Sequence, residues 1–152
     1  MNKKILAKNT EGLFNYEIMD KLTAGIVLSG PEVKSIKNSR LSLKGSYIRI
    51  DHDSEAWLIN CHVAPYEPAK NVQMGYDPQK PRKLLLRKKE ISSLIGKSKQ
   101  KGLTIIPTSV YNNKGLIKVE IALVKGKTKV DKRESIKKRE VDRQIKRTLK
   151  QR

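Results

Sequence analysis

The sequence predicts a mainly β protein, built as a closed antiparallel barrel with about six strands, two or three short helices and a basic C-terminal tail. Three observations support this fold class. Short runs of alternating apolar and polar residues recur along the chain, and turn residues join them in pairs. Two helical patterns are inserted between the strands, which favours an antiparallel barrel over a parallel sheet. Residues 125–152 contain 13 Lys and Arg but only 4 Asp and Glu.

A change from strand to helix is predicted within residues 24–37. The apolar run 25–28 is soon followed by Pro31, whose fixed φ suits the first turn of a helix. The face of this helix that packs on the strands is expected to contain Val33, Ile36 and the stem of Lys37. The face exposed to water is expected to contain Glu32, Lys34 and Ser35.

Two hairpins are predicted from alternation and turn residues. Residues 46–50 pair with 55–63 across an Asp-His-Asp-Ser turn, and residues 103–111 pair with 116–124 across Asn-Asn-Lys-Gly. In the first hairpin, strand alternation assigns these residues to the core face: Trp57, Ile59, Cys61 and Val63. It assigns these residues to the opposite face: Leu58, Asn60 and His62.

The segment between the hairpins combines a long loop with a second helix. Residues 66–81 contain three prolines and a glycine without periodicity, which predicts a surface loop of the kind that often carries function. A short strand follows at 83–86, and apolar residues at helical spacing predict a helix within 88–101. Tyr66 and Tyr76 are candidates for stacking on bases, and packing on the barrel is an equally good alternative.

The chain divides into three parts by composition. Residues 1–15 are predicted to be a flexible arm, residues 16–124 the barrel, and residues 125–152 the basic tail. In the tail, one apolar stripe recurs every fourth residue, at Val141, Ile145 and Leu149. So narrow a stripe cannot offset the entropy lost on ordering the segment. We therefore expect the tail to be disordered when free and helical on RNA, with Gly126 as its hinge.

The net charge points to a polyanionic partner. The chain carries 34 Lys and Arg against 15 Asp and Glu, a formal charge of +19. Such an excess attracts nucleic acid, and as a device for solubility alone it would cause needless self-repulsion. The single cysteine excludes an internal disulfide and suits a reducing cytoplasm. With no signal-type or membrane-length apolar run, we expect a cytoplasmic protein without membrane contact.

Patterns of catalytic and metal sites were not found in the sequence. It has no Gly-rich phosphate loop, nucleophile elbow, zinc-protease motif or calcium loop. Asp51, His52 and Asp53 could hold a metal, but successive residues of a tight turn diverge, so a plain turn is favoured. Cys61 and His62 are neighbours on a strand and point to opposite faces, which argues against a nucleophile and base. We expect no catalysis, no cofactor and no metal.

A series of motifs resembles the small protein B, or SsrA-binding protein, family over nearly the whole chain. In chain order these motifs are GIVLSGPEVKSIK, SYIRI, AWLINCHVAPYEP, YDPQKPRKLLL, LIGKSKQKGLTIIP and VDKRESIKKRE. The resemblance implies an oligonucleotide-binding type of barrel with a disordered C-terminal tail. It also implies a role in trans-translation, in which the protein and tmRNA enter a ribosome stalled on an mRNA without a stop codon.

The resemblance also implies which residues contact RNA. Residues of the family that touch the tRNA-like part of tmRNA correspond to Asn9, Leu85 and Lys118. An amide, a partly exposed leucine and an ammonium suit hydrogen bonds, unstacked bases and phosphate respectively, although Leu85 would fit a core equally well. The tail residues implied to face the small-subunit decoding centre and the mRNA channel are Lys127, Asp131, Lys132, Arg133, Lys137, Lys138 and Arg139.

The chain departs from the family pattern at several of these places. The basic arm is replaced by Thr10, Glu11 and Gly12, and the arm histidine by Phe14. The glutamate before Ala-Gly-Ile is replaced by Thr23, and an aromatic or histidine before Asp131 by Val130. We expect a monomeric, non-catalytic adaptor. The open alternatives are a general basic RNA-binding protein, a structural protein of the ribosome and an RNA-processing enzyme.

Overall fold

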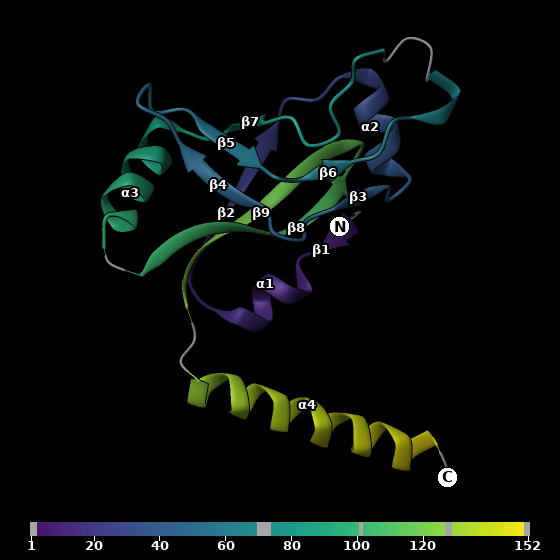
Figure 1. The fold of residues 1–152 in the computed structure, drawn as a ribbon, viewed down its shortest axis with the longest axis vertical. Coiled ribbons are helices and arrows are strands. Elements are labelled where there is room, and N and C mark those ends of the chain that lie inside the picture. The colour runs from purple at the N-terminus through teal and green to yellow at the C-terminus, as the bar shows by residue number, and fades with distance from the viewer. Residues whose placement is uncertain (1–2, 70–73, 101, 127–128, 151–152) are drawn as a thin grey trace.

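The structure, a computed structural model, describes the chain except for residues 1–2, 70–73, 101, 127–128 and 151–152. Within the described residues, seven strands form one antiparallel sheet in the order β1–β8–β9–β2–β7–β5–β4, and β3 pairs with β6 in a second sheet. The strands are β1 Lys3–Lys8, β2 Tyr16–Ile26, β3 Leu41–Ser42, β4 Tyr47–Ile50, β5 Ala56–Ile59, β6 His62–Val63, β7 Arg82–Leu85, β8 Leu103–Asn113 and β9 Leu116–Gly126. The helices are α1 Thr10–Asn15, α2 Gly30–Lys37, α3 Lys88–Ser98 and α4 Lys129–Lys150. In Figure 1, α2 and α3 lie at opposite ends of the sheet, and α4 lies apart from it.

The mainly β class is confirmed, but the closed barrel is wrong. In the described part of the chain, β1 and β4 are the two edges of the seven-stranded sheet, and no ladder joins β4 to β8. These two strands nevertheless lie close together, so the sheet curves far enough to bring them near. Part of the edge of β8, from Ser109 to Asn113, is instead paired with β1. The sequence analysis assigned no strand to residues 3–8. This extra strand pairs with an edge of β8 that a closed barrel would use for its closing ladder.

Both predicted hairpins are confirmed. β8 pairs with β9 from Leu103–Lys125 to Asn113–Leu116, and the turn between them places Lys114 and Gly115 at φ of 52° and 86°. Two successive left-handed residues match the twist of the flanking strands, and glycine adopts that conformation without strain. β4 pairs with β5 from Tyr47 to Ile59. In their turn, the Asp51 carboxylate accepts hydrogen bonds from the backbone N–H groups of Asp53 and Glu55.

The predicted faces of strand 55–63 are partly wrong. Leu58 is buried at 1% exposure, whereas Trp57 and Ile59 are only half-buried and lie on the opposite face of β5. Cys61 and Val63 are buried as predicted. Between the two groups, Asn60 has a left-handed φ of 62°, which ends β5 and reverses the alternation before β6 begins. A strict period of two could not predict this interruption.

The strand-to-helix change at Pro31 is confirmed as α2. Ser29 caps the helix, and the side chain of Glu32 accepts a hydrogen bond from the backbone of Ser29 to complete a capping box. The predicted solvent face is wrong for two residues, because Glu32 and Ser35 are buried. Ser35 donates to the carbonyl of Ala64, and Glu32 pairs with a buried arginine described below.

A hydrophobic core joins residues of the strands with one side of α2 and of α3. Its completely buried members include Ala24, Val63, Val119 and Ile121. A smaller cluster of Ile106, Ala122 and Val124 lies on the other face of β8 and β9. α1 packs against β2 and β8. Residues 3–15, predicted to be a flexible arm, therefore form a strand and a helix in the structure.

Candidate nucleic-acid interface

Two of the residues predicted to touch RNA lie in one row across the sheet. Gly25 on β2 pairs with Lys118 on β9 and with Leu85 on β7. Directly paired residues of antiparallel strands project to the same face, so Lys118 and Leu85 flank a position that has no side chain. The sheet therefore sets a cation and an apolar group side by side with a gap between them.

Leu85 lies on the solvent face of the sheet. It is 54% exposed, whereas the adjacent Leu84 is buried in the core. A Cβ atom built on Gly25 would lie 3.3 Å from the Cβ of Leu85, so the absence of a side chain leaves room for the leucine. The surface position fits contact with unstacked bases, and its contact with RNA stays a prediction.

The row continues toward the first edge of the sheet. Tyr111 on β8 pairs with Lys118, and Ile5 on β1 pairs with Tyr111. The ammonium of Lys3 lies 4.1 Å from the centre of the Tyr111 ring, and Ile5 is half exposed. A strip of apolar and cationic side chains thus crosses five neighbouring strands.

Asn9 lies outside this row, and its amide is occupied within the protein. It is 5% exposed and caps α1, accepting a hydrogen bond from the backbone of Gly12. Its side-chain N–H group donates to the carbonyl of Pro107 at 2.8 Å, and its backbone N–H donates to Thr108. The structure places Asn9 as the residue that fixes α1 to β8. Its burial leaves little of this side chain accessible to RNA.

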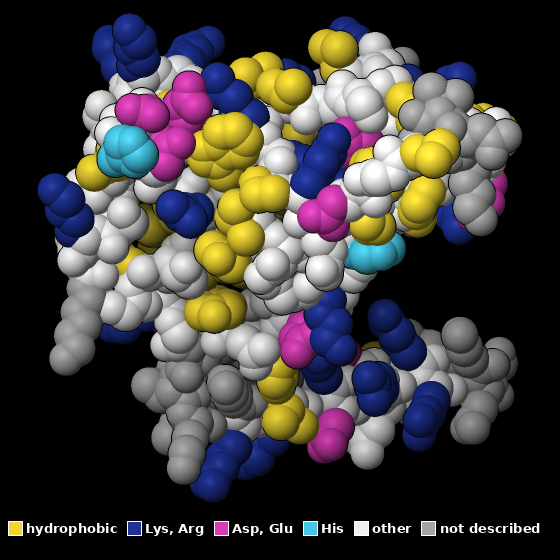
Figure 2. All heavy atoms as spheres, turned by 45° about the horizontal axis from the view of Figure 1, so that its top comes forward, with side chains coloured by type: hydrophobic (Ala, Val, Ile, Leu, Met, Phe, Trp, Pro, Cys, Tyr) yellow, Lys and Arg dark blue, Asp and Glu magenta, His cyan; other side chains and the backbone are white. Residues whose placement is uncertain are grey.

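Two carboxylates of the sheet, Asp20 on β2 and Glu120 on β9, are paired with lysines. Asp20 lies 3.0 Å from Lys97, and Glu120 lies 3.4 Å from Lys21. The hydrogen bond from Lys97 lowers the pKa of Asp20, so the carboxylate of Asp20 is charged at neutral pH. In Figure 2, Lys and Arg side chains are spread over the visible face and along α4.

A buried arginine fixes the long loop to the body, a feature that the sequence analysis missed. Arg82 is 2% exposed and pairs with the equally buried Glu32. Lys80 lies 3.2 Å from the same carboxylate and stays partly exposed. The guanidinium also donates to the hydroxyl of Tyr76 and to the carbonyls of Cys61, Pro78 and Lys80. Alternation in β7, which puts Arg82 on the same face as Leu84, was the available signal.

The acidic member of this cluster is held in its charged form. Burial alone would raise the pKa of Glu32, but hydrogen bonds from Ser29 and Arg82, together with Lys80, lower it below the ordinary value of 4.5. Burial raises the pKa of Tyr76, whose hydroxyl donates to the carbonyl of Val63 at 2.9 Å. Tyr76 therefore packs on the body, the alternative to base stacking. The Tyr66 ring lies 5.4 Å from the ammonium of Lys34.

The residues weighed as metal ligands or as a catalytic pair lie in ordinary structural positions. Cys61 is buried, which raises the pKa of its thiol to about 11, and His62 is exposed. Asp51 uses one carboxylate oxygen for the turn and the other for the indole N–H of Trp57, at 2.9 Å. Across the described residues, no group of three or more His, Cys, Asp or Glu side chains could hold a metal ion.

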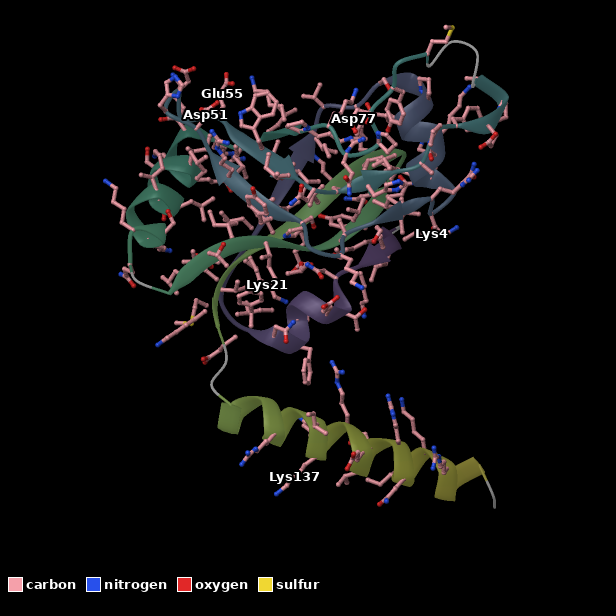
Figure 3. All side chains as sticks on the ribbon, in the orientation of Figure 1. Lys4, Lys21, Asp51, Glu55, Asp77 and Lys137 are labelled. Carbon is pink, nitrogen blue, oxygen red and sulfur yellow. The ribbon has the colours of Figure 1, made fainter. Side chains whose placement is uncertain are left out.

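The tail forms the long helix α4 directly beyond the sheet. Gly126, the predicted hinge, is the last residue of β9 and pairs with Tyr16. The exposed cations of α4 include Arg133, Lys137, Lys138 and Arg139. Figure 3 shows Lys137 on the side of α4 that faces away from the sheet. Asp131 and Lys132 belong to α4 but their side chains are not described, and Lys127 lies outside the described residues.

A cation–π contact joins α4 to α1. The guanidinium carbon of Arg139 lies 4.7 Å from the centre of the Phe14 ring on α1. The apolar residues Ile136, Val141 and Ile145 remain 45–53% exposed, so the contact leaves these apolar side chains of the helix uncovered. In the described chain, no helix combines the length and apolar character needed to cross a bilayer.

Fold and site together define a small, strongly basic β-sheet protein whose open sheet face combines cations with exposed apolar side chains. A family model described as "SmpB protein" matches residues 6–151. The chain belongs to the SmpB family.

Relatives and a solved structure agree with this assignment. The SsrA-binding protein of Sulfurihydrogenibium sp. (strain YO3AOP1) is 50% identical over 150 residues, which cover 99% of this chain and 97% of the relative. That of Enterococcus faecalis (strain ATCC 700802 / V583) is 49% identical over 97% of this chain and 94% of its own length. A chain from a structure described as "tmRNA-SmpB: a journey to the center of the bacterial ribosome" matches with a TM-score of 0.66 and 40% identity. The match covers 86% of this chain and 93% of that one.

Proposed function

We propose that this protein binds tmRNA and acts in trans-translation, rescuing ribosomes stalled on mRNAs that lack a stop codon. The observation that carries the proposal is the similarity to SsrA-binding proteins at about half of all positions over nearly the whole chain. The charge of +19 supplies the long-range attraction that a tightly folded RNA requires. The protein would act in the cytoplasm, as a non-catalytic adaptor.

The body is the part that holds the RNA in this proposal. The strip through Lys118, Gly25 and Leu85 would contact the tRNA-like part of tmRNA, with the ammonium on phosphate and the leucine under an unstacked base. Support comes from the register that aligns these residues and from the exposure of Leu85.

The tail is the part that binds the ribosome in this proposal. Its cations would follow rRNA phosphates in the mRNA channel and decoding centre, a path that is open only when no mRNA fills it. Charge along α4 and the uncovered Ile136, Val141 and Ile145 support a helix that is completed by RNA around it. In free protein we propose that the segment is largely disordered, because the cation–π contact between Arg139 and Phe14 contributes little to its stability.

Filter binding of a tmRNA transcript against a tRNA competitor, at two salt concentrations, tests RNA recognition. Shape recognition predicts that tmRNA stays bound at a tRNA excess that removes non-specific complexes, and that this preference survives higher salt. Equal competition by tRNA at both salt concentrations would contradict specific tmRNA binding.

Deletion of residues 127–152 tests the division between body and tail. The cut after Gly126 keeps β9 whole, because Lys125 and Gly126 still pair with β2. We expect the shortened protein to keep tmRNA affinity within about fivefold, since the strip remains, and to lose peptide tagging of stalled nascent chains. Loss of both activities in a folded truncation would contradict the division.

A further inference from the structure

The solvent face of the sheet contains a hollow beyond the strip. It is lined by Arg49, Asp51, Trp57, Ile59 and Pro81, and its volume is about 430 Å³. The lining is mostly apolar, with one cation and one carboxylate. In Figure 2, hydrophobic side chains form a band over this part of the sheet.

The hollow is continuous with the strip described above. Lys83 lies two residues before Leu85 on β7, so the two side chains share a face. Lys83 pairs with Trp57 on β5, and Trp57 pairs with Arg49 on β4. These three residues therefore form a second row on the same face, next to the row of Lys118 and Leu85.

The tryptophan at the centre of the hollow is held in a fixed orientation. Its indole N–H donates to Asp51, and that carboxylate also accepts two backbone hydrogen bonds of the turn. The backbone N–H of Glu55 and the indole N–H lower the pKa of Asp51 and keep it charged. Figure 3 shows Asp51 and Glu55 together at the turn between β4 and β5. Because the hydrogen bond is made at the edge of the indole, the face of the ring can still stack on a ligand.

The charges around the ring favour a base over a phosphate in the hollow itself. Asp51 repels phosphate but can accept hydrogen bonds from the amino groups of a base. Glu55 is neutralised by Lys83 at 3.2 Å, which leaves Arg49 as the exposed cation of the lining. A nucleotide would place its base on Trp57 and its phosphate toward Arg49.

We propose that the Trp57 hollow binds one unpaired nucleotide of the RNA, with the base stacked on the indole and the phosphate paired with Arg49. The inference rests on the proposed function, because it extends the RNA-binding face from Leu85 across β5 to β4. Trp57 is the single tryptophan of the sequence, so its fluorescence reports on this site alone.

The experiment measures two signals while full-length protein is titrated with a tmRNA transcript: retention on a filter and Trp57 emission. Emission should fall with the same midpoint as retention, and bound RNA should shield the indole from acrylamide. A fully paired RNA duplex should bind through charge and leave emission unchanged. Retention of tmRNA without an emission change would overturn the inference and leave the proposed function intact. Absence of retention would contradict both the inference and the proposed function.

Matched variants separate stacking from bulk charge. Arg49→Gln should weaken tmRNA binding by about tenfold, whereas Arg40→Gln, which removes an equal charge from an exposed residue outside the rows, should change it less than about threefold. Trp57→Phe retains a ring and should stay within about threefold of wild type, and Trp57→Leu should weaken binding by about tenfold. Circular dichroism melting confirms that each variant folds. Equal effects of Arg49→Gln and Arg40→Gln would overturn the proposal.

Discussion

The body of the protein and its C-terminal helix differ in the burial of their apolar residues. In the body, Val119, Ile121 and Val124 are completely buried, whereas in α4 Val141 and Ile145 are each 53% exposed. Burial of apolar surface is the main favourable contribution to folding, so the body has its own source of stability and α4 does not. The chain therefore combines a domain that buries its own apolar side chains with a helix whose apolar side chains would be buried only by a partner.

The largest expected effect comes from the buried ion pair that fixes the long loop. Arg82→Met should lower the free energy of unfolding by about 3–5 kcal/mol, because it leaves the buried charge of Glu32 with the partly exposed Lys80 as its remaining ionic partner. Urea denaturation measures the loss. Lys80→Met removes the exposed partner and should cost about 1 kcal/mol or less. Similar losses in the two variants would show that the pair is not buried as described.

A matched pair of core and tail substitutions tests the comparison directly. Ile121→Ala should lower the free energy of unfolding by about 2–5 kcal/mol, because it leaves a cavity in the core. Ile145→Ala removes the same atoms from an exposed position and should change that free energy by about 0.5 kcal/mol or less. Denaturation monitored by Trp57 fluorescence checks both. A large loss for Ile145→Ala would place α4 within the folded body.

Acid should weaken the body through Glu32. Its pKa in the folded protein lies below the ordinary 4.5, so its contribution is complete above that pH and is lost as pH falls through the folded value. The difference in unfolding free energy between wild type and Glu32→Gln should therefore shrink as the pH is lowered below about 4.5. Urea melts between neutral pH and acid measure it, and a difference independent of pH would contradict the assignment.

The smallest effect is expected where α4 touches the body. Arg139→Gln should speed amide exchange within α4 by about fivefold or less, since an exposed cation–π contact contributes about 0.5–1 kcal/mol. Lys138→Gln removes an equal charge from the same helix and is the control. Exchange in α4 should be far faster than in β9 in either variant. Protection of α4 equal to that of β9, without RNA, would contradict a tail that is largely disordered when free.

Elements with strong local signals were predictable from the sequence. Alternation and turn residues located both hairpins, and Pro31 after Ser29 located α2. The strip was reached through the family resemblance, and the register of β2 with its neighbours then aligned Leu85 with Lys118. Local patterns fix such elements because their hydrogen bonds and caps lie within a few residues.

Features set by distant contacts were not predictable. Arg82 and Glu32 are 50 positions apart and are buried only because each neutralises the other, whereas charged residues are otherwise placed at the surface. Asn60 reverses the faces of its strand through one left-handed residue. The role of Asn9 depends on Pro107 and Thr108, which lie on a strand distant in sequence. The periodicity of apolar and polar residues does not predict these distant contacts or this backbone conformation.

The open sheet has a consequence for a protein proposed to work beside unfinished polypeptides. β1 ends the sheet with main-chain groups that an incompletely folded chain could pair with, and adhesion of that kind leads to aggregation. Lys3, Lys4 and Lys8 of this strand are all exposed. A strand that paired with β1 would have to lie against three ammonium groups. Positive charge therefore opposes strand addition at an edge that a closed barrel would not have.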